Sequence, residues 1–200
     1  MKTICISGLC GSGKTTAVTT LAQHLPNSAA VHGDIFFRTA LLRHKNEFEE
    51  IYGFRLDTAQ PGRSLRRAAN NASIESIRKY HEFFHILAPY IEQEIENAVF
   101  ANQKQGKNFC LVEYVTLPMF RIWAQADYRV IVFQNKELRK SKVRERTIEK
   151  YGQNSEEHHT FREAAWGTLI DNAIDIDFSV ENRYDDTFER DLIILCRNFL

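Results

Sequence analysis

Five short, mostly apolar runs lie along the chain, and the longer segments between them repeat apolar residues every three or four positions. Continuous rather than alternating apolar runs are typical of strands buried on both faces of a parallel sheet. The segments between them have helical spacing, most extensively over residues 64–104, where Pro89 starts or kinks a helix. The apolar runs cover residues 3–7, 29–34, 108–115, 128–133 and 176–182. This pattern predicts a doubly wound α/β domain with a five-stranded parallel sheet, whose ligands bind at the carboxyl ends of the strands.

Residues 45–62 interrupt the regular pattern. They are mixed and rich in turn residues, among them Gly53, Pro61 and Gly62, so we place a boundary there. Two hundred residues suit one domain with an inserted subdomain. We therefore expect a single domain over residues 1–200, with a helical substrate-binding subdomain at 45–105.

Composition narrows the class of partner. Lys plus Arg equal Asp plus Glu at 26 each, so no global charge favours nucleic acid or a membrane surface. We expect a small-molecule substrate, no nucleic-acid or membrane partner and an oligomeric state that the sequence leaves open. The chain enters its first strand at once, which leaves no room for a signal peptide, and its four cysteines show no metal spacing. We therefore expect a cytoplasmic protein.

The segment "GLCGSGKTT" at residues 8–16 fits the phosphate-binding pattern G-x-x-x-x-G-K-[ST]. Its glycines allow the backbone N–H groups to turn toward a polyphosphate, Lys14 adds a positive charge, and Thr15 supplies a hydroxyl for Mg²⁺. A strand-like run precedes the loop and a helical run over 14–24 follows it, as this motif requires. The cofactors predicted are ATP and Mg²⁺, and the residues expected to bind ATP are Gly8, Gly11, Ser12, Gly13, Lys14, Thr15 and Thr16.

Phosphoryl transfer also needs a base for the attacking hydroxyl. Asp34 ends the second predicted strand and opens a helix, so it is our candidate for the base, although its position also suits a helix N-cap. Arg38 lies one helical turn later and could bind an anionic acceptor, or it could be a solvated surface arginine. Glu113 lies within the third apolar run, where a carboxylate could bind Mg²⁺ through water or be satisfied in the core.

Three positive charges share one face of the predicted helix over 136–151. Arg139, Lys142 and Arg146 lie at i, i+3 and i+7, whereas Arg144 points elsewhere. Such a face is often simply solvated, but it could also close over ATP as a lid. We expect a lid region at 137–165, with Arg146 as the catalytic arginine.

Taken together, these residues resemble the dephospho-CoA kinase family, which has the P-loop kinase fold and catalyses the last step of coenzyme A synthesis. The loop matches the family's G-x-x-G-S-G-K-[ST]-T, and "HGDIFFR" matches its D-x-D-x-I-x-R at Asp34 and Arg38. "IYGFRLD", "LAPYIEQEI" and "IDFSVEN" are similar to three further family segments. The resemblance implies transfer of the γ-phosphoryl of ATP to the ribose 3′-hydroxyl of dephospho-CoA, with Asp34 as base and Lys14 and Arg146 contributing to catalysis.

The chain departs from the family pattern at several positions. His32 replaces an Asp, Thr58 an Arg and Ala88 a His, and "VEYVTLPMF" only echoes the family's L-D-x-P-L-L-F. A nucleoside or nucleoside monophosphate kinase is therefore the alternative, and a nucleotide-binding protein without catalysis is a third. A GTP-binding switch is disfavoured, because Leu138 stands where "FQNKEL" would need an Asp to read guanine.

Overall fold

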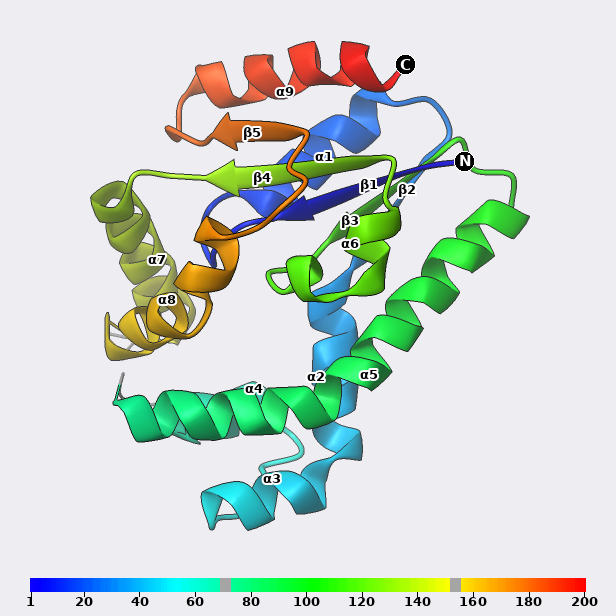
Figure 1. Ribbon diagram of the computed structural model, residues 1–200. Helices are drawn as coiled ribbons and strands as arrows, with labels where there is room; N and C mark the ends of the chain where they lie inside the picture. Colours follow the sequence, from blue (N-terminus) through cyan, green and yellow to red (C-terminus); the bar gives the residue numbers. More distant parts are fainter. Residues whose placement is uncertain (69–72, 152–155) are drawn as a thin grey trace.

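A computed structural model describes residues 1–68, 73–151 and 156–200 (Figure 1). Its centre is a five-stranded parallel sheet with the strand order β2-β3-β1-β4-β5. The strands are β1 (Lys2–Ser7), β2 (Ser28–His32), β3 (Phe109–Glu113), β4 (Tyr128–Phe133) and β5 (Phe178–Glu181). The predicted five-stranded parallel sheet is confirmed, with each strand inside the apolar run that indicated it or within a residue of it.

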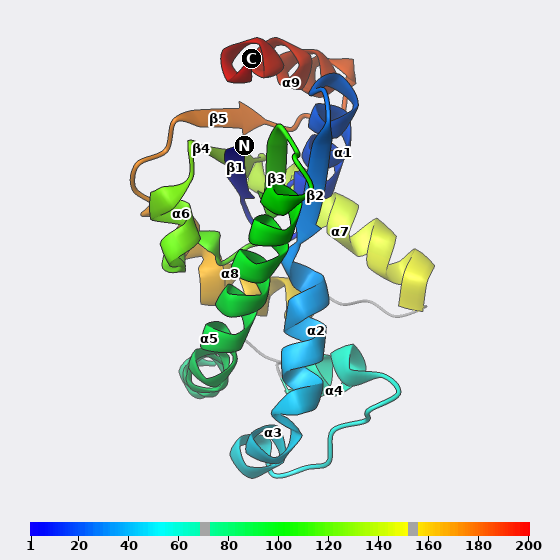
Figure 2. The ribbon, with the colours of Figure 1, turned by 90° about the vertical axis from the view of Figure 1, so that its right-hand side faces the viewer.

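Helices cover both faces of the sheet, and the helical part on one side extends well beyond it (Figures 1 and 2). The helices are α1 (Lys14–His24), α2 (Gly33–Arg43), α3 (Lys45–Tyr52), α4 (Pro61–Ala68), α5 (Ile74–Lys104), α6 (Arg121–Gln125), α7 (Lys136–Tyr151), α8 (Glu156–Asp171) and α9 (Asp186–Phe199), with a 3-10 turn, η1, at Leu117–Met119. Helix α5 contains Pro89 and bends along its length in Figure 1, because proline removes one helical hydrogen bond.

The sheet separates two hydrophobic cores because neighbouring side chains of a strand point to opposite faces. Ile4 and Ile6 of β1 pack with α1 and α9, around Leu21 and Leu192. Cys5 faces the other, larger core, which includes residues of α2, α3, α5, α6 and α8. The two cores fix the carboxyl ends of β1, β2 and β3 side by side, and this is where the candidate site lies.

Two segments differ from the sequence-based expectation. Residues 45–52 form the regular helix α3 and not a mixed segment, because the wholly buried Phe48 anchors them against Phe83 of α5 with ring centroids 5.5 Å apart. Residues 156–171 form α8, which the sequence pattern does not single out. The division into a substrate-binding subdomain at 45–105 and a lid at 137–165 stays a prediction. No helix among the described residues is long and apolar enough to span a membrane.

Candidate functional site

The loop between β1 and α1 has the backbone that its glycines predict. Gly8, Gly11 and Gly13 have φ angles of 145°, 83° and 102°, a region that L side chains rarely enter. Gly8 also lies against β4, so close that an added Cβ would be 2.1 Å from the carbonyl oxygen of Val132. Gly13 directly precedes α1, and the free N–H groups at the start of that helix make the end of the loop an anion site.

Two residues of the segment after β5 donate hydrogen bonds to this loop. Asn182 is buried and donates from Nδ2 to the carbonyl oxygen of Ser12 over 2.9 Å. The hydroxyl of Tyr184 donates to the carbonyl oxygen of Gly11 over 2.6 Å. Because these bonds occupy two successive carbonyl groups on one side of the loop, they help to fix its shape. Sequence reasoning assigned neither residue to the site, since the contacts join positions 170 and 173 residues apart.

Lys14 lies at the first position of α1, with Nζ donating to the carbonyl oxygen of Leu9 over 3.0 Å. Removal from solvent lowers the pKa of Lys14 below its usual value, while the negative groups around it, including Asp34 and Glu113, act in the opposite direction. The amine is thus held among anions at a place where a phosphate group would add further negative charge. The loop and these carboxylates therefore lie together, as the sequence predicts.

Glu113, at the end of β3, joins the loop to β2. Its Oε1 accepts hydrogen bonds from Thr15 Oγ1 at 3.0 Å and from His32 Nδ1 at 2.6 Å, when that nitrogen carries the proton. The other carboxylate oxygen, Oε2, is buried and has no hydrogen-bond partner among the described residues. A buried carboxylate oxygen without a partner is costly unless a cation or water reaches it.

This arrangement fits a magnesium ion that arrives with a nucleotide. Among the described residues, no group of three or more His, Cys, Asp or Glu side chains is placed to hold a metal alone. Mg²⁺ commonly takes one or two protein oxygens, several waters and substrate phosphates. The Thr15 hydroxyl and the Glu113 carboxylate supply oxygens of this kind. That they bind Mg²⁺ stays a prediction, as does water-mediated contact through Glu113.

Asp34 is an exposed residue in the first turn of α2, just beyond the end of β2. The N-cap of this helix is His32, so Asp34 is not the cap. It follows the carboxyl end of β2, at the sheet edge from which the phosphate loop leaves β1, and its charge influences the pKa values of Lys14, Cys10 and Arg162. Arg38 is also exposed and follows one helical turn later, so the two residues can contact one acceptor.

A second cation, Arg162 of α8, reaches the loop, and the sequence pattern does not indicate it. Its Nη1 donates to Cys10 Sγ over 3.2 Å. Burial disfavours the charged guanidinium, but the anionic forms of Cys10, Tyr80 and Asp34 prevail and raise the pKa of Arg162. Burial likewise acts to raise the pKa of the Cys10 thiol, yet the positive charges of Arg162 and Lys14 lower it. A guanidinium in this place can bind the anionic group that the loop holds.

The described side chains of the predicted lid face, Arg139 and Lys142, form ion pairs with different residues. Arg139 is buried and pairs through Nη2 with Glu163 Oε2 of α8 at 3.3 Å. Lys142 pairs with Glu145 at 2.9 Å and lies 5.8 Å from the ring centroid of Tyr184. Arg146 belongs to α7, but its side chain lies outside the described part of the structure. Their roles as lid residues, and that of Arg146 in catalysis, stay predictions.

Comparisons with known proteins establish the fold. No protein-family model and no curated protein matches the sequence. Among solved structures, TT1252 from Thermus thermophilus is 18% identical, with a TM-score of 0.66 over 99% of this chain and 96% of that one. A dephospho-CoA kinase from Campylobacter jejuni is 16% identical, with a TM-score of 0.54 over 99% and 96%. These similarities span nearly the whole chain and confirm the expected P-loop kinase fold.

Proposed function

We propose that the protein is an ATP-dependent small-molecule kinase. The observation that carries the proposal is a loop with three left-handed glycines, to which Lys14 Nζ and Arg162 Nη1 donate hydrogen bonds at Leu9 O and Cys10 Sγ. Asp34 follows β2 at the same edge of the sheet. Two cations and the N-terminus of α1 suit a polyphosphate, and the exposed carboxylate suits a hydroxyl that is to be deprotonated. The P-loop kinase fold agrees with this chemistry.

Each residue has a separate task in the proposed reaction. Lys14 and the loop N–H groups hold the phosphates of ATP, and Asp34 accepts the proton of the acceptor hydroxyl. The hydroxyl oxygen attacks the γ-phosphorus, and the bond from that phosphorus to the β,γ-bridging oxygen breaks to release ADP. The guanidinium of Arg162 neutralises negative charge on the phosphoryl group in transit, an interaction that is strongest in the transition state. Mg²⁺, when bound, would neutralise charge on the β- and γ-phosphates, with Thr15 and Glu113 as the residues that hold it.

Dephospho-CoA is our first candidate for the acceptor. Support comes from the family motifs around Asp34 and Arg38, and from the fold shared with a protein described as a dephospho-CoA kinase. If dephospho-CoA is the acceptor, the reaction belongs to coenzyme A biosynthesis. All four cysteines are free, which supports the cytoplasmic setting expected from the sequence.

A nucleoside or nucleoside monophosphate kinase is the second candidate, because His32 departs from the dephospho-CoA kinase pattern. The imidazole stands where the family has an Asp, and it is bound to Glu113 at 2.6 Å. The polar groups around the predicted base therefore differ from the family pattern close to the acceptor. A protein that binds nucleotide without catalysis is the least favoured reading, because Lys14, Thr15 and Asp34 are all retained.

An acceptor panel tests the proposal. ADP release from Mg²⁺-ATP is measured with dephospho-CoA, AMP, CMP, uridine and pantetheine, for the wild type and for Asp34→Asn. We expect release that depends on dephospho-CoA and falls about 10²–10⁴-fold in Asp34→Asn, which keeps the size of the side chain but cannot take the proton. Release driven only by AMP, CMP or uridine would move the assignment to the second candidate. No release with any acceptor, together with intact ATP binding, would contradict a kinase.

A further inference from the structure

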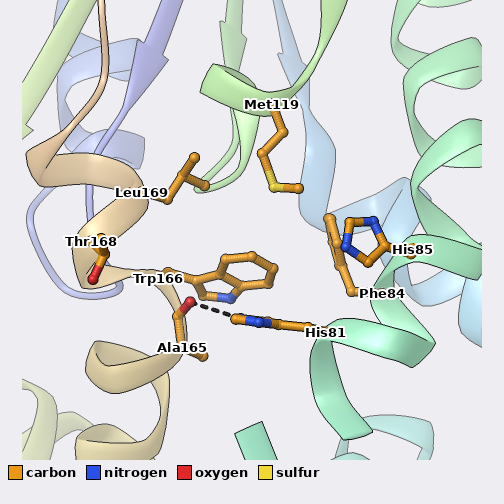
Figure 3. Close-up of a pocket in the computed structure, with 8 residues that line it drawn as sticks. All are labelled: His81, Phe84, His85, Met119, Ala165, Trp166, Thr168 and Leu169. Carbon is orange, nitrogen blue, oxygen red and sulfur yellow. Dashed lines mark hydrogen bonds between the residues drawn. The ribbon is translucent and has the colours of Figure 1, made fainter. Parts of the chain in front are cut away.

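A cavity of about 210 Å³ lies between α5, η1 and α8, apart from the residues of the phosphate loop (Figure 3). Phe84 and Trp166 are buried in its wall, beside the half-buried His81. His85, Met119 and Thr168 are exposed side chains that line it as well. The cavity is smaller than the roughly 300–1,000 Å³ of pockets that enclose a whole drug-sized ligand, so it suits a single ring system.

The rings of this wall are packed against one another and held in place. The centroids of Trp166 and His81 are 5.1 Å apart, and those of Trp166 and Phe84 are 4.8 Å apart. His81 Nε2 lies 2.9 Å from the carbonyl oxygen of Ala165, which fixes the imidazole across the gap between α5 and α8 (Figure 3). A wall of fixed aromatic rings favours a planar ligand, because aromatic pairs gain energy beyond the area that they bury.

A buried tyrosine, Tyr80, extends the ring wall of this cavity. Tyr80 is buried and packs on Trp166 with centroids 5.5 Å apart, and the charges of Arg162 and Asp34 influence its hydroxyl. Trp166 follows Arg162 by four residues on α8, so the two side chains project from one side of the helix. The same helix thus presents a guanidinium to the phosphate loop and an indole to the cavity.

We propose that this cavity is a second binding site, for a planar heteroaromatic ring, and that its occupation stabilises the packing of α8 on α5. A ligand that contacts residues of both helices binds only while they are packed together, so binding must shift the population toward that arrangement. Packing of α8 on α5 also keeps Arg162 beside Cys10. None of the residues that line the cavity has a task in the proposed phosphoryl transfer, and binding requires no turnover to be detected.

Fluorescence of Trp166 tests the site directly. The chain has two tryptophans, and Trp123→Phe leaves Trp166 as the sole indole. Titration of this variant with adenine should give saturable quenching, whereas cyclohexanol, a saturated and non-planar ring, should give none at the same concentrations. Adenine should also raise the melting temperature of the wild type, as any ligand specific for the folded state does.

A matched pair of substitutions locates the ring. Thr168→Phe fills the cavity from an exposed position of α8 and should abolish the quenching, while Ala164→Phe, at another exposed α8 position outside the cavity, should leave it intact. His85→Ala, a second exposed lining position, should weaken adenine binding without lowering the melting temperature.

Two outcomes would overturn the proposal. One is quenching that survives Thr168→Phe but disappears with saturating ATP, which would put adenine in the nucleotide site. The other is the absence of saturable quenching by adenine in a folded Trp123→Phe variant. The kinase proposal is tested separately, because none of these measurements depends on phosphoryl transfer.

Discussion

Replacing Arg162 by Ala removes a cation from the phosphate site at little cost to the fold. Its Nη1 lies 3.2 Å from Cys10 Sγ, and loss of the guanidinium leaves a thiol, a group that tolerates burial without a charged partner. Two unit charges about 4 Å apart interact by about 4 kcal/mol at an effective dielectric constant of 20. Since each 1.4 kcal/mol is about tenfold in rate, the upper bound is about 10³-fold.

We therefore expect Arg162→Ala to lower kcat about 10²–10³-fold, in the range of single transition-state donors. Arg162→Lys should recover part of the rate, since it keeps the charge but not the planar donor geometry. The assay is steady-state ADP release, with ATP affinity from calorimetry and stability from urea unfolding. The matched control is Arg129→Ala, which breaks the pair with Asp177 at 3.1 Å at the start of β4, the end of the strand opposite the candidate site.

Arg129→Ala should cost about 1–3 kcal/mol of stability, because it removes the cation that pairs with the Asp177 carboxylate, and should leave kcat near the wild-type value. A kcat for Arg162→Ala within about threefold of the wild type would refute the catalytic role, since one transition-state donor is worth far more. Equal losses of kcat in both variants, with unchanged stability, would show that Arg162 contributes no more to catalysis than the control arginine.

Three further predictions concern the loop. Lys14→Ala should weaken ATP binding roughly tenfold to a hundredfold, as expected for a lost charged hydrogen bond, and calorimetry showing an unchanged Kd would count against the ATP site. Iodoacetamide should modify Cys10 before Cys110, because neighbouring cations lower the pKa of Cys10 while burial raises that of Cys110 to about 11. The rate of Cys10 alkylation should fall as the pH drops through that lowered pKa, and bound ATP should slow the reaction. If peptide mass spectrometry shows equal alkylation of Cys10 and Cys110, the prediction is wrong. Gly13→Ala should destabilise the fold by about 1–3 kcal/mol in urea unfolding, because φ is 102° and the new Cβ would meet Asn182 Nδ2 at 2.3 Å; an unchanged midpoint would show that the loop relaxes freely.

The parts of the structure predicted correctly are those with local signals. The loop motif, the apolar strand runs and the start of α1 at Lys14 all lie within short stretches of sequence, and each agrees with the structure. Asp34 was placed near the loop because the carboxyl ends of parallel strands share one edge of a sheet. The expected strand topology alone is therefore enough to assign Asp34 and the phosphate loop to one predicted site.

The missed features depend on packing between distant segments. Arg162 meets Cys10 across 152 residues, and α8 carries buried and exposed residues without a clear apolar stripe that would mark it as a helix. His32 and Glu113 meet across 81 residues in neighbouring strands, so their hydrogen bond has no signature in either segment. Helix α3 was missed although Phe48, Ile51 and Tyr52 have helical spacing, because it is only eight residues long and turn residues follow it.

The most direct test of the account is the fate of the γ-phosphoryl group of ATP. Wild-type protein is incubated with Mg²⁺, γ-labelled ATP and dephospho-CoA, and the products are separated and identified by mass spectrometry. The account predicts label on the 3′-hydroxyl of the acceptor ribose, in amounts equal to the ADP formed, with Asp34→Asn folded but about 10²–10⁴-fold slower. Label that appears only in inorganic phosphate, or transfer that Asp34→Asn leaves at the wild-type rate, would contradict it.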